Sequence, residues 1–348
     1  MTLTLPTPRI IEAESVPALR WGVIGVGIAE SFVAALHAHT PQRAVAVTSL
    51  RPERAAAFAA KHGIATVHPS VDALVADPNV DAVYVATPHP LHQAQALAAI
   101  AHGKHVLIEK PIAMSADEAR AMTDAGRSAG LLVMEAMWTR YLPQSDIVRQ
   151  VIADGLLGDV HLVQADFGFV APADPTHRLW NPALGGGALL DAGVYPISFA
   201  SSVLGAPSAI HAVGATLDNG VDTRAHMAIS YTGGGVSLLS TSLVTTLPIE
   251  AQVMGTKGRL KVLSPFFGPT GVEVTVGQFT TAETATWRDE RFPGMYDAMC
   301  GEAIAFASYV AEGRTESPVH PHDELVAVMA TIDEVRAQLA AASTPRGE

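Results

Sequence analysis

The sequence predicts an α/β protein. A doubly wound parallel sheet comes first, followed by an α+β domain with a large, mostly antiparallel open sheet. From Trp21 onward, short apolar runs alternate with segments of helical length, as in successive βαβ units. After about Tyr141 the pattern changes to β-like runs joined by short turns, which favours antiparallel pairing.

In the first half, each apolar run is followed by a turn and a helical segment. Pro41 and Gly63 end the first two helices, and Ser115 followed by Glu118 has the spacing of a capping box. The expected strands cover residues 20–25, 43–48, 65–67, 80–87, 105–109 and 131–135, and the helices cover 29–40, 52–62, 70–75, 90–102 and 115–129.

In the second half, turn signals such as Asp218-Asn219-Gly220 separate the β-like runs. The expected strands cover residues 160–169, 209–217, 225–231, 236–243, 249–253 and 259–263, and the helices cover 143–153, 188–204, 295–312 and 323–342. The simplest division of the chain is therefore an arm (1–19), a Rossmann domain (20–140), an α+β domain (141–342) and a tail (343–348).

Composition limits the possible partners. The chain has 348 residues, is 49% hydrophobic and carries a formal net charge of -12, which argues against nucleic acid or an anionic membrane as main partner. An anionic cofactor is not excluded, because backbone N–H groups and one or two arginines can hold phosphates. Cys300 is the only cysteine, and neither a signal peptide nor an apolar run of membrane-spanning length stands out, so we expect a cytoplasmic protein.

A glycine pair stands where the first strand should turn into the first helix. Gly25 and Gly27 have the spacing that lets a pyrophosphate approach the backbone, and Ile28 and Ala29 then begin the helix. Glu30 occupies the position where the common motif has a third small residue, so we expect Ala29 to take that packing role. The alternative is an ordinary strand-to-helix turn.

The end of the second strand indicates which nicotinamide cofactor is bound. NAD sites usually place an acidic residue here for the ribose 2′-hydroxyl, whereas an arginine accommodates the 2′-phosphate of NADP. Ser49 stands in place of the acid, and Arg51 and Arg54 follow it, which favours NADP over NAD. Alternatively, Arg51 is a solvated loop residue.

A lysine follows the fifth strand directly, in the sequence Glu109-Lys110-Pro111. Ends of parallel strands border the crevice in which open α/β sheets bind ligands, and Pro111 favours an extended backbone at Lys110. On this pattern alone, a ligand-facing lysine and a solvated strand end remain equally open.

Together these features resemble the Gfo/Idh/MocA oxidoreductase family, and within it the dimeric dihydrodiol dehydrogenases and NADP-dependent xylose dehydrogenases. The resemblance rests on the segments 86–92, 103–111, 134–140 and 185–196. It implies hydride transfer between NAD(P) and a sugar, polyol or cyclic diol, and a homodimer or higher oligomer formed through the second domain's sheet.

The resemblance assigns catalysis to Lys110, Asp191 and Tyr195. Asp191 and Tyr195 are four residues apart and share one face of a helix that Pro196 should bend. A free tyrosine has a pKa of about 10, and a nearby lysine ammonium favours the phenolate, so Lys110 could tune Tyr195 as the group that exchanges the proton. Which of the three moves the proton is left open, and the alternative for the helical pair is a surface Asp–Tyr contact.

Further residues are expected to line the two ligands. His92 could instead be a structural histidine at a helix start, and Tyr296 could belong to a core helix. The expected cofactor contacts are Thr87, Pro88, His92, Glu109, Trp138 and Arg140, and the expected substrate contacts are His177, Trp180 and Tyr296. We expect no metal site at His320 and His322, because no third ligand is evident nearby.

Two other functions remain possible for such a chain. Some relatives are hydrolases that use tightly held NAD for transient oxidation during glycoside cleavage. A catalytically silent NADP sensor is the other, and it would be expected to lose Lys110, Asp191 or Tyr195, all of which are present. The sequence does not identify the substrate.

Overall fold

The computed structural model describes residues 3–343, which divide into two compact units. The parallel-sheet unit consists of Ile10–Tyr141 and Phe292–His322. The open-sheet unit consists of Leu142–Arg291 together with residues 3–9 and 323–343. The predicted tail at 344–348 lies outside the described residues.

Six parallel strands form the sheet of the first unit in the order β3-β2-β1-β4-β5-β6. The strands are β1 (Arg20–Ile24), β2 (Arg43–Thr48), β3 (Thr66–Val67), β4 (Ala82–Val85), β5 (His105–Glu109) and β6 (Val133–Ala136). The α-helices are α1 (Ala29–His39), α2 (Pro52–His62), α3 (Val71–Val75), α4 (His92–Ala101), α5 (Ala116–Ala129) and α8 (Cys300–Ala311), with 3-10 turns η1 (Ala13–Ser15), η2 (His89–Leu91), η3 (Trp138–Tyr141) and η8 (Met295–Met299). This strand order is that of a dinucleotide-binding Rossmann sheet, whose order reverses between β1 and β4.

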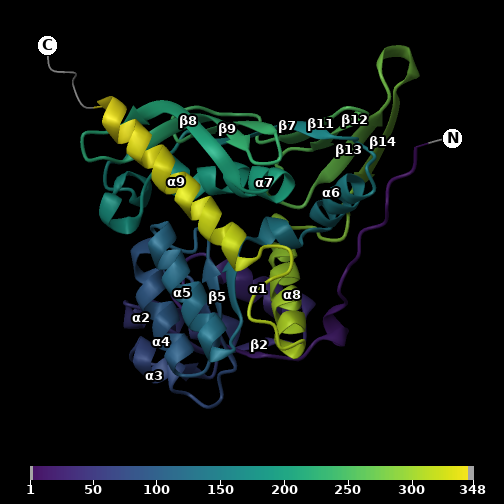
Figure 1. The fold of residues 1–348 in the computed structure, drawn as a ribbon. Coiled ribbons are helices and arrows are strands. Elements are labelled where there is room, and N and C mark those ends of the chain that lie inside the picture. The colour runs from purple at the N-terminus through teal and green to yellow at the C-terminus, as the bar shows by residue number, and fades with distance from the viewer. Residues whose placement is uncertain (1–2, 344–348) are drawn as a thin grey trace, which may run out of the picture. The chain divides into compact units, whose positions relative to one another are not determined.

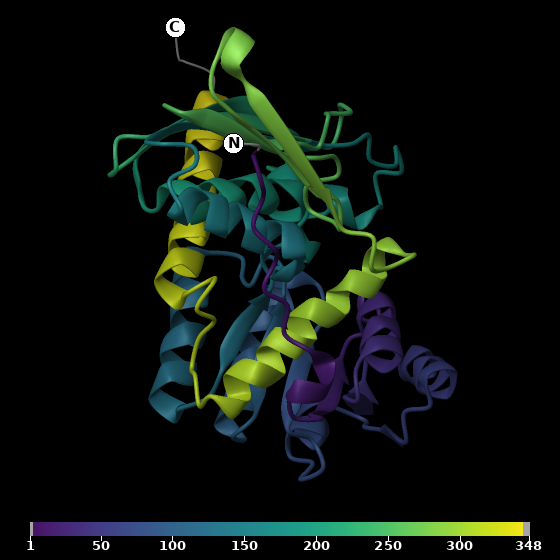
Figure 2. The ribbon, with the colours of Figure 1, turned by 90° about the vertical axis from the view of Figure 1, so that its right-hand side faces the viewer.

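Residues 292–322 return to the parallel-sheet unit, whereas the sequence prediction placed them in the second domain. The reason is core packing around Trp21, which is fully buried. Its ring lies 4.9 Å from that of Phe306 on α8, and Gln42 accepts from the Trp21 indole while donating to the carbonyl of Ala303. Helix α8 therefore packs beside α1 (Figures 1 and 2).

The open-sheet unit contains eight strands in the order β14-β13-β12-β11-β7-β10-β9-β8. They are β7 (Val160–Gly168), β8 (Pro207–Thr216), β9 (Asp222–Tyr231), β10 (Val236–Ser242), β11 (Ala251–Gly255), β12 (Gly258–Val262), β13 (Gly271–Val276) and β14 (Glu283–Arg288). Its helices are α6 (Pro143–Ala153), α7 (Val194–Leu204) and α9 (His322–Ser343), with short turns η4 (Arg178–Trp180), η5 (Pro182–Leu184), η6 (Leu189–Gly193) and η7 (Phe279–Thr281). Every pairing is antiparallel except that of β7 with β10, so the predicted fold class is confirmed.

Two strands of this sheet were missed by the sequence prediction, whose last expected strand ended at residue 263. They form the β13–β14 hairpin, which extends beyond its neighbours at the edge of the sheet (Figure 2). β14 has the sequence Glu-Thr-Ala-Thr-Trp-Arg and is exposed or half-buried throughout, so it lacks the apolar run of a buried strand.

One face of the open sheet is covered by helices and the other is not. Helices α6 and α7 lie on the covered face (Figure 1), where Val163 and Ala165 of β7 are buried. The helical stretch Pro182–Leu204 is long and apolar enough to cross a membrane. However, 72% of its apolar 18-residue segment is buried inside the protein, as in a core helix.

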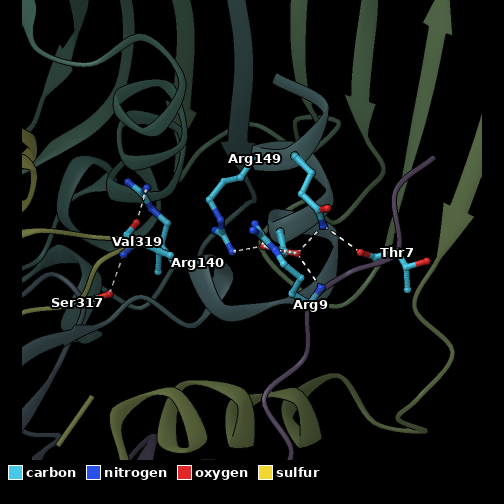
Figure 3. A network of polar contacts seen from close by, with 8 residues as sticks. Thr7, Arg9, Arg140, Arg149, Ser317 and Val319 are labelled. Carbon is cyan, nitrogen blue, oxygen red and sulfur yellow. Dashed lines mark hydrogen bonds and ion pairs between the residues drawn. The ribbon is translucent and has the colours of Figure 1, made fainter. Parts of the chain in front are cut away.

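Residues 7 and 9 of the N-terminal arm are held on α6 (Figure 3). Arg9 forms an ion pair of 2.7 Å with Asp146, which Arg149 approaches at 3.5 Å, and Gln150 donates to the carbonyl of Thr7. Burial alone would raise the pKa of Asp146, but the hydrogen bonds from Arg9 hold this pKa below its usual value.

Candidate active site

The glycine turn after β1 lies at the point where the strand order reverses. Gly25 has a φ of 95°, and a Cβ there would lie 2.5 Å from the carbonyl oxygen of Ala86, at the end of β4. A Cβ on Gly27 would meet no atom within 4 Å, so the backbone is open on that side. Helix α1 follows without a side-chain cap, leaving its amino end available to an anion. Ile28 is partly exposed, and Ala29 is fully buried, in line with its expected packing role.

The end of β2 carries the residues expected to choose between the two cofactors. Ser49 is half-buried and its hydroxyl accepts from the backbone N–H of Arg51 at 3.4 Å. Arg51 and Arg54 are exposed at the start of α2, and neither forms an ion pair within residues 3–343. Both guanidinium groups are therefore available to an anionic ligand.

The strand end after β4 is held by His92, which does not point into the crevice. His92 is fully buried, with Nε2 2.9 Å from the carbonyl of Thr87 and Nδ1 3.1 Å from that of Pro111. Burial lowers its pKa, despite these carbonyl contacts. The structure thus favours the structural alternative over a cofactor contact: His92 ties together the loops after β4 and β5, while Thr87 is half-buried and Pro88 is exposed.

Lys110 and Glu109 face different environments at the end of β5. Lys110 is partly exposed, whereas Glu109 is 7% exposed and turned inward. The Glu109 carboxylate accepts from the hydroxyl of Tyr84 and from the backbone N–H of Lys110. The expected cofactor contact by the Glu109 side chain is therefore not supported, because both of its oxygens are engaged inside the unit.

After β6, Trp138 and Arg140 also differ from the expectation. Trp138 is 5% exposed and stacks on Tyr296, with ring centroids 5.9 Å apart. Arg140 is buried and donates to the carbonyl of Val319 at 3.3 Å (Figure 3), which is an internal contact. Tyr296 is 50% exposed, so of these three side chains it is the one best placed to meet a ligand.

In the open-sheet unit, Asp191 lies in a π-helical turn and Tyr195 in the α-helix that follows. The sequence predicted one α-helix bent at Pro196, whereas residues Leu189–Gly193 form the wider turn η6. Such π turns occur mostly as single turns inside α-helices and are frequent at functional sites. Asp191 accepts from Arg178 of η4 at 2.9 Å, a partner that sequence reasoning missed.

The ring of Tyr195 is fixed by two phenylalanines. It is 7% exposed, and its centroid lies 5.4 Å from those of Phe167 and of Phe267. The two phenylalanine rings stack on each other at 4.5 Å. Such packing orients the phenol with little remaining freedom.

The glycine run before this helix allows a close approach, as expected. A Cβ on Gly186 would lie 2.6 Å from the carbonyl oxygen of Leu179, and one on Gly187 would lie 2.3 Å from Oδ1 of Asp222. Asp222 is buried and accepts from the N–H of Leu189 at 2.7 Å, so it fixes the start of η6. Nothing in its sequence context indicated this role.

The two expected substrate residues of this unit are also partly engaged. His177 caps η4 by accepting from the N–H of Leu179, and the indole of Trp180 donates to the carbonyl of Pro172 at 2.7 Å. Both stay half-buried in the same loop as Arg178. As for metals, the described part of the chain has no group of three or more His, Cys, Asp or Glu side chains suited to an ion.

Comparison with known proteins gives matches along most of the chain. A model described as "Oxidoreductase family, NAD-binding Rossmann fold" matches residues 19–137, and one for the GFO/IDH/MocA C-terminal domain matches residues 146–261. Trans-1,2-dihydrobenzene-1,2-diol dehydrogenase from Sus scrofa is 37% identical, over 92% of this chain and 96% of the relative. The Homo sapiens enzyme of the same name is 36% identical with the same coverage.

Solved structures have a similar fold. A 3-ketoreductase from Actinomadura kijaniata, in complex with NADP and TDP-benzene, is 29% identical with a TM-score of 0.79, covering 92% of this chain and 98% of its own. Variants of that enzyme with a lysine replaced by alanine or a tyrosine replaced by phenylalanine have also been solved. A levoglucosan dehydrogenase with NADH and levoglucosan has a TM-score of 0.85, covering 93% of this chain and 98% of its own, and at 22% identity it supports the fold alone.

Proposed function

Because the chain belongs to the Gfo/Idh/MocA oxidoreductase family, we propose that it is an NADP-dependent dehydrogenase or reductase acting on a sugar, polyol or cyclic diol. The enzyme class, an NAD(P)-dependent oxidoreductase acting on CH–OH groups, follows from the family and its dehydrogenase relatives. The dihydrodiol and sugar substrates named for those relatives support the proposed substrate class.

The observation that carries the proposal is the geometry of the strand ends in the parallel-sheet unit. The open backbone at Gly27 follows β1, where the strand order reverses between β1 and β4, and dinucleotides bind at this point of Rossmann sheets. Lys110 follows the adjacent strand β5 and is the partly exposed residue beside the buried Glu109. A lysine at this strand end borders the crevice in which open α/β sheets bind ligands.

We assign the protein's part of the chemistry to Lys110, Asp191 and Tyr195. The bound nicotinamide supplies or accepts the hydride. The phenol of Tyr195, oriented by its aromatic neighbours, exchanges the proton of the substrate hydroxyl, and Lys110 stabilises the phenolate. Asp191, which holds Arg178, orients the substrate.

The choice of substrate and cofactor is tested by a panel of pentoses, hexoses and cyclic diols, assayed separately with NADP and NAD. Net reduction of NADP with at least one member supports the proposal. Glycoside cleavage without net cofactor turnover would favour the hydrolase alternative. Cofactor binding with neither reaction would favour a sensor.

NADP is preferred over NAD on the evidence of Arg51 and Arg54. Replacing Arg51 by alanine removes an exposed guanidinium without disturbing an ion pair in the described chain. The Kd for NADP should rise about 10- to 100-fold, since a hydrogen bond to a charged phosphate contributes roughly 1.5–3 kcal/mol. The Kd for NAD should stay within about twofold, and fluorescence titration measures both. Equal changes for the two cofactors would contradict a 2′-phosphate contact.

A homodimer through the open face of the large sheet is the proposed assembly. On that face Leu238 of β10 is 45% exposed between Gln164 of β7 and Ala228 of β9, and Val213 of β8 is 69% exposed. Exposed apolar side chains on a wide sheet face are typical of an interface.

Replacing Leu238 by lysine should therefore weaken the dimer by at least about 100-fold in Kd, because a charge would be buried at the interface. Light scattering at micromolar concentration measures the molar mass of the assembly. Val67→Lys, on the edge strand β3 of the other unit, is the control and should leave the mass unchanged. A Leu238→Lys variant with the wild-type mass, or a monomeric wild-type protein, would exclude this interface.

A further inference from the structure

Three glutamates are buried together in the parallel-sheet unit. Glu109 on β5 is 7% exposed, Glu135 on β6 is 2% exposed and Glu302 on α8 is fully buried. Burial raises the pKa of each, to about 7 for Glu135, and the charges of Glu109 and Glu135 raise that of Glu302 further. At neutral pH the cluster cannot hold three full negative charges.

Two of these carboxylates hold the backbone that carries Lys110. Oε2 of Glu109 accepts from the N–H of Lys110 at 3.1 Å, and Oε1 of Glu135 accepts from the N–H of Ile112 at 2.8 Å. On the other side, the imidazole of His92 faces the carbonyls of Pro111 and Ile112. The N–H of Ile112 is therefore held by a buried carboxylate, and its carbonyl lies against the buried ring of His92.

The second oxygen of Glu135 faces a site where donors are scarce. Within the described chain, Oε2 of Glu135, both oxygens of Glu302 and both ring nitrogens of His320 lack hydrogen-bond partners. Nδ1 of His320 lies 3.6 Å from Oε2 of Glu135. Burial, with the charge of Arg140, lowers the pKa of His320, so this imidazole is neutral.

The remaining titratable groups around the cluster come from several neighbouring elements and loops. Tyr84 of β4 donates to Glu109, and the charges of Arg140 and Lys110 favour ionised Glu135. Tyr141, whose pKa is raised by burial, faces Glu302 and Tyr309, and His322 faces His320 while contacting the carbonyl of Val133. Glu135 thus has both a backbone contact to the Lys110 segment and cations that support its charge.

We propose that Glu135 is a positioning residue for Lys110, whose ionised carboxylate fixes the Ile112 amide and with it the strand end that presents the lysine. The inference rests on the proposed function of Lys110. A carboxylate accepts an amide proton more strongly than a neutral carboxyl, so protonation of Glu135 loosens this hold. Turnover should then fall as the pH decreases through about 7, where Glu135 takes up its proton.

The test compares pH profiles of kcat and KM for the wild type, Glu135→Gln and Glu302→Gln. In Glu135→Gln the amide oxygen of the introduced side chain can still accept from Ile112, but it carries no charge and does not titrate. The kcat of the wild type should fall below about pH 7, which gives its pH profile an acidic limb. Glu135→Gln should lack this limb, with kcat reduced about 10-fold and KM for the cofactor unchanged. Glu302→Gln should keep the limb, because Glu302 belongs to the same buried cluster but has no backbone contact to the lysine segment. An unchanged limb in Glu135→Gln, or its loss in Glu302→Gln instead, would overturn the inference.

Infrared pH titration provides a readout that needs no turnover. A carboxyl band titrating near pH 7 should be present in the wild type and Glu302→Gln and missing from Glu135→Gln. Its absence from the wild type overturns the inference, whereas a titrating band in a protein inactive on every substrate points to failure of the proposed function. If Glu135→Gln does not fold, Glu135→Asp serves: its shorter carboxylate falls short of Ile112, so kcat should drop and the limb should be lost. Wild-type kcat, or a retained limb, would overturn the inference.

Discussion

Replacing Lys110 by methionine should reduce kcat by about 100- to 10,000-fold, the range expected when a group that acts on the proton in transfer is removed. Methionine keeps most of the length of the side chain and removes only the charge and its donors. Because Lys110 is partly exposed at the end of β5, the substitution leaves no cavity in the core. The Kd for the cofactor should change little, and stopped-flow measurement of hydride transfer would show the loss directly.

Lys257→Met is a matched control for this variant. Lys257 is exposed in the turn between β11 and β12 and has no part in the proposed chemistry. Its kcat should equal that of the wild type. Full activity in Lys110→Met would remove the lysine from the mechanism, and weakened cofactor binding with normal kcat would make it a binding residue only.

The sequence predicted the fold well wherever burial is strong. The parallel strands are covered on both faces, so β1, β4 and β5 are apolar runs that stand out from the helices around them. β14 could not be found this way, because an exposed edge strand carries polar residues. The return of α8 to the first unit depends on contacts such as Trp21 with Phe306, 285 positions apart, which local patterns do not encode.

For the site, the strand-end rule located the loops but not the direction of each side chain. Gly25, Thr87 and Lys110 follow β1, β4 and β5, as their places after apolar runs indicated. Glu109 and His92, by contrast, turn inward to bind backbone groups of the neighbouring loops. The partner of Asp191 is Arg178, 13 residues earlier in an irregular loop, and its only sequence signal was its place between His177 and Trp180.

Replacing Tyr195 by phenylalanine should also lower kcat by about 100- to 10,000-fold if its hydroxyl exchanges the proton. The ring packs between Phe167 and Phe267, and phenylalanine preserves those contacts, so the melting temperature should change by only a few degrees. Tyr231→Phe is the matched control. Tyr231 is 5% exposed in the same unit and its hydroxyl bonds to Ser237, so its loss should cost about 1 kcal/mol of stability and leave kcat unchanged.

The double variant Lys110→Met/Tyr195→Phe decides whether the two residues act as a unit. If the lysine works by stabilising the phenolate, removing the hydroxyl leaves it nothing to stabilise, and the double variant should be no slower than the slower single variant. If each acts independently on the substrate, the two losses should multiply. Nearly normal kcat in Tyr195→Phe, with strong loss in Lys110→Met, would instead assign the proton to the lysine.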